Sequence, residues 1–182
     1  MARPGPPRSV VVVLLLAALI TALAVGAAIV FLRNPGTDAV SLQGEPMTDV
    51  AAAGQVVASA RQIVSMAQLR GATGGYAFVS CKNKTEPPYQ VALHMTFGLP
   101  QSNSVKYLRD IASTMVANGW TLAPTTDEHF GQKLTKDGVT AIFYGHGNDT
   151  DVATMRLYGE CRIAADHRND NPVWTDLAGQ LG

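Results

Sequence analysis

An uncharged apolar run near the N-terminus constrains this chain more than any other feature. The run extends from Val10 to Leu32, and Thr21 carries its only polar side chain. As an α-helix these 23 residues would rise about 34 Å, enough to cross a hydrocarbon core of about 30 Å. We therefore predict a transmembrane helix over residues 10–32.

The charges on either side of the run predict its orientation. Arg3 and Arg8 precede the run, whereas Arg33 stands alone after it before the next proline. Positive residues gather on the cytoplasmic side of membrane helices. We expect residues 1–9 to form a cytoplasmic tail and the C-terminal part of the chain to be exported.

Small residues inside the run raise two questions: whether the run is cleaved as a signal peptide, and whether it contacts a second transmembrane helix. Ala22-Leu23-Ala24 has the small-x-small form of a signal-peptide cleavage site. The apolar run continues well beyond that site, which favours retention over cleavage. Ala18, Ala22 and Gly26 recur every four residues, a spacing that would let a second transmembrane helix approach one face. No cysteine lies near the run, so we expect the helix itself, not a lipid, to be the anchor.

The charge balance excludes one class of partner. The chain has 14 Lys and Arg against 14 Asp and Glu, so no net field attracts it to a polyanion. We therefore expect no nucleic-acid partner.

A linker and a helix follow the run. Residues 33–46 are rich in Pro, Gly, Ser and Asp and lack apolar periodicity, which is typical of a linker. An exported α+β domain is predicted over residues 47–165, and its first helix over residues 47–69, ended by Gly71 and Gly74-Gly75. Spacings of three and four predict one apolar stripe, made of Val50, Ala53, Val57, Ala60, Val64 and Ala67.

Two strands are predicted next. Residues 76–81 should form a strand that turns Ala77, Val79 and Cys81 inward. Residues 89–97 alternate with period two, with Gln90, Ala92, His94 and Thr96 on the second face, which indicates an antiparallel sheet with one face in water. The predicted inner face of this strand consists of Tyr89, Val91, Leu93, Met95 and Phe97.

Turn and cap residues organise the following segment. A second helix should begin after Pro100 with Ser102 or Ser104 as its cap, and end at Asn118-Gly119. A short strand is predicted over residues 120–123. Asp137-Gly138 lies between two strand-like runs, a pattern typical of a hairpin.

The last strand should extend to Ile163, and the tail over residues 166–182 has room for a short helix at residues 172–181. Both long helices need to bury one apolar stripe. The simplest architecture that does so is a two-layer α+β domain with an antiparallel sheet packed on two helices.

The two cysteines, Cys81 and Cys161, both fall at inward positions of predicted strands in the exported part. An oxidising compartment would allow them to pair, and the alternative is two separate buried thiols. We expect the disulfide, which would close a loop of about 80 residues and stabilise a small core.

The sequence shows no local pattern for catalysis. The four histidines, His94, His129, His146 and His167, have no spacing typical of a zinc site. No Gly-x-Ser-x-Gly motif and no phosphate-binding glycine loop occurs. We predict that the protein is not an enzyme and holds no metal and no cofactor.

Several short motifs together resemble a known family. In chain order they are Ser80-Cys81, Pro87-Pro88, Asn118-Gly119, Asp137-Gly138 and Gly159-Glu160-Cys161-Arg162. Their order is similar to that of the LppA-type envelope proteins of mycobacteria and other actinobacteria, over about residues 50–165. The resemblance implies a two-layer α+β domain with a disulfide between its first and last strands, which maps to Cys81 and Cys161. It implies no catalytic residues, and this chain departs from the family in lacking a lipid-attachment cysteine.

These features favour a membrane-anchored, extracytoplasmic, non-catalytic module of the cell envelope that binds a protein, lipid or glycan. The predicted wet face of the sheet carries an excess of aromatic residues, which are favoured at interfaces. This candidate binding face consists of Tyr76, Phe78, Tyr144 and Tyr158. The first alternative is a subunit or assembly factor of a membrane complex, recognised through Ala18, Ala22 and Gly26. The second is a hydrolase whose catalytic residues are dispersed in the sequence.

Overall fold

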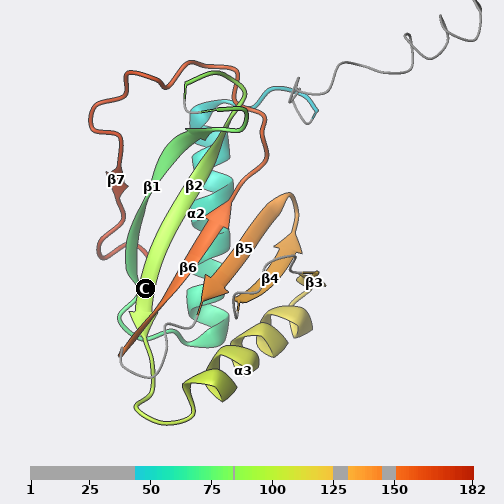
Figure 1. The fold of residues 1–182 in the computed structure, drawn as a ribbon, viewed down its shortest axis with the longest axis vertical. Helices are drawn as coiled ribbons and strands as arrows, with labels where there is room; N and C mark the ends of the chain where they lie inside the picture. The colour runs from blue at the N-terminus through green and yellow to red at the C-terminus, as the bar shows by residue number, and fades with distance from the viewer. Residues whose placement is uncertain (1–43, 84, 125–130, 145–150) are drawn as a thin grey trace, which may run out of the picture. The chain divides into compact units, whose positions relative to one another are not determined.

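The computed structural model describes residues 44–83, 85–124, 131–144 and 151–182. Within these ranges the chain forms two helices and one antiparallel sheet (Figure 1), so the predicted α+β class is confirmed. The strands lie in the order β3-β4-β5-β6-β2-β1-β7. The elements are α2 (Asp49–Ala67), β1 (Thr73–Ser80), β2 (Tyr89–Gly98), α3 (Ser104–Ala117), β3 (Thr121–Ala123), β4 (Gly131–Lys136), β5 (Val139–Tyr144), β6 (Val152–Tyr158) and β7 (Thr175–Asp176).

Residues 1–43 lie outside the described ranges, and with them the predicted tail, the predicted transmembrane helix over residues 10–32 and most of the predicted linker. Neither α2 nor α3 is both long and apolar enough to cross a bilayer, and no other helix occurs in the described part of the chain.

Helix α2 begins and ends where local chemistry favours it. The hydroxyl of Thr48 accepts a hydrogen bond from the backbone N–H of Ala51 at 3.2 Å, which satisfies one free donor of the first turn. Gln68 takes the left-handed conformation that closes the last turn. The helix buries one stripe against the sheet, made of Ala52, Ala53, Val56, Val57, Ala60, Ile63 and Val64.

The second helix, α3, differs from expectation at its start. Its cap is Asn103, in the left-handed conformation and without a side-chain capping bond, so neither Ser102 nor Ser104 is the cap. Its end at Asn118-Gly119 is as predicted, because Gly119 has a φ of +87° that a side chain would strain. Both helices contribute to one core cluster with the inner face of the sheet.

The hairpin predicted from Asp137-Gly138 is confirmed. Asp137 has φ 48° and Gly138 has φ 77°, and two consecutive positive φ values match the twist that a two-residue connection requires. β2 also alternates as predicted, and its inner residues from Tyr89 to Phe97 are all buried.

Gly74 and Gly75 lie inside β1, not in the expected turn. A Cβ atom on Gly74 would lie 2.8 Å from the Cα of Met95, and one on Gly75 would lie 2.6 Å from the carbonyl oxygen of Thr175. The neighbouring backbones therefore leave no room for a side chain at either position. The two glycines serve close strand approach and do not end the helix.

The C-terminal tail is a correction. Residues 172–181 form no helix; Thr175 and Asp176 form β7, which pairs with Tyr76 and Gly75 of β1. The physical reason is that β1 would otherwise present an open row of backbone donors and acceptors. Leu177 and Leu181 are buried as expected, whereas Val173 is exposed. The tail is thus part of the domain, which extends beyond residue 165.

Candidate functional site

The sheet has one covered and one uncovered face. The covered, inner face carries the core residues that α2 and α3 pack against, and Figure 1 shows α2 behind the strands. No helix of the described residues covers the opposite side, which we call the outer face. Residues that pair across neighbouring strands share one face, so the register assigns to the outer face Ala77, Ala92, His94, Thr96, Thr140, Ile142, Thr154, Arg156 and Tyr158.

This register corrects two residues of the predicted binding face. Phe78 pairs with Val91 and Tyr76 with Leu93, and both partners belong to the buried set of β2. Tyr76 and Phe78 therefore lie on the inner face, where they pack against the core. Ala77, expected inward, faces outward. The predicted orientation of β1 is wrong by one residue, so each of its side chains lies on the face opposite to the predicted one. Small residues alternate with aromatic residues in this strand, and neither set indicates which face the helices cover.

The backbone pairing places Tyr144 and Tyr158 on the outer face, as predicted. Tyr158 pairs with Ala92 and lies on the outer face. Tyr144 pairs with Thr154, which is also an outer-face position. The side chain of Tyr144 lies outside what the structure describes, so the register alone places this residue.

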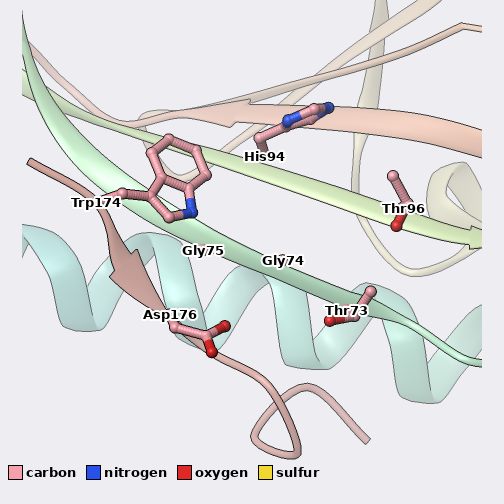
Figure 2. A pocket seen from close by; sticks show the side chains of 7 residues that line it. All are labelled: Thr73, Gly74, Gly75, His94, Thr96, Trp174 and Asp176. Carbon is pink, nitrogen blue, oxygen red and sulfur yellow. The ribbon is translucent and has the colours of Figure 1, made fainter.

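A hollow of about 320 Å³ opens on the outer face where β1, β2 and the tail meet (Figure 2). Its lining residues are Thr73, Gly74, Gly75, His94, Thr96, Trp174 and Asp176. The sequence reasoning placed His94 on the wet face but missed Trp174 and Asp176, because their position depends on the pairing of the tail with β1. The sequence feature that could have indicated this site is a tryptophan in a polar tail, two residues after Pro172.

His94 forms one wall of the hollow. Its ring lies edge-on to the indole of Trp174, with centroids 6.4 Å apart and planes at 77°. Burial lowers the pKa of His94 from its ordinary value of 6.5, and the positive charge of Arg156 lowers it further. Its Nε2 atom is buried and has no hydrogen-bond partner among the described residues. The imidazole is therefore neutral at pH 7 and keeps a free polar atom.

We expect the ring resonances of His94 to titrate by NMR with a midpoint below 6.5. Since burial is the larger cause, Trp174→Ala should raise that midpoint more than Arg156→Gln does. The pKa of His94 is lower in the folded state than in the unfolded state, where it is 6.5. Above pH 6.5 the residue is neutral in both states and does not weaken the fold. As the pH falls from 6.5 toward the lower pKa of the folded state, the unfolded chain takes up a proton first, so the free energy of unfolding decreases. A midpoint at or above 6.5 in the wild type would contradict this description of the site.

His167 was expected at the surface but is buried, with 7% of its side chain exposed. Its Nδ1 lies 2.9 Å from a carboxylate oxygen of Asp170, and its Nε2 lies 3.3 Å from one of Asp49, at a geometry too poor for a hydrogen bond. Its ring stacks on Phe78 at 4.0 Å between centroids. His167 thus fastens the start of the tail to the first turn of α2 and to β1.

Cys81 and Cys161 form a disulfide with an S–S distance of 2.05 Å and Cα atoms 6.1 Å apart. The link joins the end of β1 to the segment that follows β6, two elements that flank β2 in the sheet. Both cysteines of the chain are used in this bond. The disulfide lies apart from the hollow and acts on the fold.

Comparison with known proteins identifies the family. The family described as "Putative lipoprotein LppJ" matches residues 48–180. The chain belongs to the LppJ family. The match includes the tail with Trp174 and Asp176, in agreement with a domain that ends beyond residue 165. The expected resemblance to mycobacterial envelope proteins is thereby confirmed.

Members of the LppJ family from three mycobacterial strains are similar over nearly their whole length. Proteins described as putative lipoprotein LppJ from Mycobacterium tuberculosis strains CDC 1551 and H37Rv and from Mycobacterium bovis are each 35% identical over 175 residues. The alignment covers 92% of this chain and 90% of each relative. No solved structure matches the chain.

These LppJ relatives are named as lipoproteins and not as enzymes. Among the described residues no group of three or more His, Cys, Asp and Glu side chains could hold a metal ion. Glu160 and Arg162 form an ion pair at 3.2 Å, and Arg162 also donates to the backbone oxygen of Glu45 at 2.6 Å. Arg162 thereby joins the segment after β6 to the segment before α2, which is a structural role. His129 and His146 lie outside the described residues, as do Ala18, Ala22 and Gly26.

Proposed function

We propose that this LppJ-family chain is a membrane-anchored, extracytoplasmic, non-catalytic binding module of the cell envelope. The uncharged run over residues 10–32 would anchor it, and the arginines before that run favour an extracytoplasmic domain. A disulfide within the domain suits an oxidising compartment. The names of its relatives support a place in the envelope.

The mode of anchoring that we propose differs from the one that those names suggest. A lipoprotein carries its lipid on a cysteine, and both cysteines of this sequence are joined to each other. We therefore assign the anchor to the predicted helix. Ala18, Ala22 and Gly26 would give that helix a face for a second transmembrane helix. Residues 10–32 can be replaced by a foreign transmembrane helix to test this. Loss of function would indicate that the helix recognises the partner, and retained function would indicate that the domain does.

The outer face of the sheet carries the proposed binding role. It is broad because it extends over β1, β2, β6 and β5, which are neighbours in the sheet, and no described helix covers it. It combines Tyr158, a row of threonines and the hollow beside Trp174, a mixture of aromatic and polar groups that is favoured at interfaces.

The outer face can be tested with Tyr144→Ser combined with Tyr158→Ser. We expect partner capture in native membranes to fall at least about fivefold, the loss that corresponds to roughly 1 kcal/mol. The thermal midpoint should change little, because Tyr158 does not belong to the core cluster and the register places Tyr144 on the same outer face. Val105→Ser on α3, where the side chain is 68% exposed, is the matched control and should leave capture intact. Equal capture by the double variant and the wild type would argue against this face.

A further inference from the structure

We infer that the hollow on the outer face is a subsite for one ring of a neutral carbohydrate. The inference rests on the proposed binding function and names its ligand class. Side chains from two distant parts of the chain line it together: His94 comes from β2, and Trp174 and Asp176 come from the tail (Figure 2).

Trp174 supplies an aromatic platform that the fold holds in place. The next residue, Thr175, pairs with β1, so the indole is fixed against the sheet edge even though 45% of the side chain is exposed. A Cβ on Gly75 would collide with the indole, so a glycine is required beneath it. The chain's other tryptophan, Trp120, is buried. An exposed indole face packs well against the C–H face of a sugar ring.

Polar groups around the indole match the hydroxyls of a sugar. One carboxylate oxygen of Asp176 accepts from the backbone N–H of Ala178 at 3.0 Å, and its second oxygen has no partner among the described residues. Thr73 and Thr96 face each other across the strand pair, and both line the hollow. Hydroxyls both donate and accept, as sugar hydroxyls do.

The charge and size of the hollow narrow the ligand class. Asp176 is the only charged lining residue, which disfavours phosphates and carboxylates. Arg156 pairs with His94 across the sheet and disfavours a cation. The volume of about 320 Å³ is at the small end of the roughly 300 to 1,000 Å³ typical of ligand sites, so it suits one ring. The hollow is open to solvent, which leaves room for the rest of a glycan.

The experiment uses the full-length chain in a detergent without a sugar headgroup. The probes are methyl glycosides of glucose, mannose, galactose, arabinose and N-acetylglucosamine, followed by saturation-transfer NMR and by the fluorescence of Trp174. At least one glycoside should bind saturably. Trp174→Ala and Asp176→Asn should each weaken binding at least fivefold, and Trp174→Phe should weaken it less, because a smaller ring still stacks. Asn at position 176 keeps an oxygen for Ala178, so the turn survives. Val173→Ala, at an exposed neighbouring position, should have no effect.

Three results would overturn the inference. No glycoside of the panel binds; or binding persists unchanged in both Trp174→Ala and Asp176→Asn; or inorganic phosphate or choline binds in place of sugars and is lost in the same variants. If sugars fail while the double replacement of Tyr144 and Tyr158 still abolishes partner capture, only the carbohydrate assignment is wrong. If both experiments fail, the proposed role of the outer face is wrong as well.

Discussion

Replacing Cys81 and Cys161 together by serine is expected to lower the free energy of unfolding by about 2–4 kcal/mol. The disulfide spans 80 residues of chain, so it removes many extended conformations from the unfolded ensemble. It also fixes the ends of β1 and of the segment after β6 on either side of β2. A loss of this size would lower the thermal midpoint by ~10 °C in a domain of this length.

Denaturant unfolding of the oxidised wild type, the reduced wild type and the double serine variant measures this effect. The reduced wild type should match the variant, and reductant should leave the variant unchanged. A loss below about 1 kcal/mol would mean that the unfolded chain is already compact, or that the rest of the sheet determines stability without the link.

Phe78→Ala is expected to lower the free energy of unfolding by about 2–3 kcal/mol, at or below the lower end of the range for a fully buried phenylalanine because Phe78 is only partly buried. Its ring packs against the core cluster and stacks on His167. The adjacent Val79→Ala should cost under about 1 kcal/mol, because Val79 pairs with Gln90 on the outer face.

This pair of variants tests the phase of β1 directly. Shifting the strand by one residue would move every side chain to the opposite face. Chemical denaturation of both variants gives the ratio of the two losses. A larger loss for Val79→Ala than for Phe78→Ala would restore the orientation predicted from the sequence and return Phe78 to the candidate binding face.

Elements with strong local signals were predictable. β2 alternates large apolar residues with small or polar ones from Tyr89 to Phe97, and Asp137-Gly138 selects a turn that few other pairs allow. The end of α3 was predictable for the same reason, because Gly119 adopts a positive φ that stops the helix locally. These features depend on interactions between residues close in sequence, so the sequence alone was enough to place them and to predict the α+β class.

The phase of β1 and the position of the tail depend on contacts between distant residues. Tyr76 faces the core because it pairs with Leu93, and β7 forms because Thr175 meets Tyr76 about a hundred residues away along the chain. Neither pairing has a local signature. The hollow was missed for that reason, since Trp174 and Asp176 reach it only through the tail.

The buried position of His167 shows the same limit. A histidine in a polar segment is typical of the surface, yet Asp49, Asp170 and Phe78 surround it in the fold. Its contacts give the tail a second attachment point besides β7. The contacts of His167 and the pairing of β7 together hold Trp174 at the edge of the outer face. The candidate site therefore depends on a polar tail whose sequence does not indicate that it is part of the fold.

Site-specific photo-crosslinking in native membranes would show whether the outer face contacts a partner. A photoreactive phenylalanine analogue is placed at position 154 or 140 on the outer face, and at position 105 on α3 as the matched control. If the outer face binds a partner, adducts to protein or to glycan should form from positions 154 and 140, and none should form from position 105. Adducts from position 105 alone, or equally from all three positions, would contradict a binding role for the outer face.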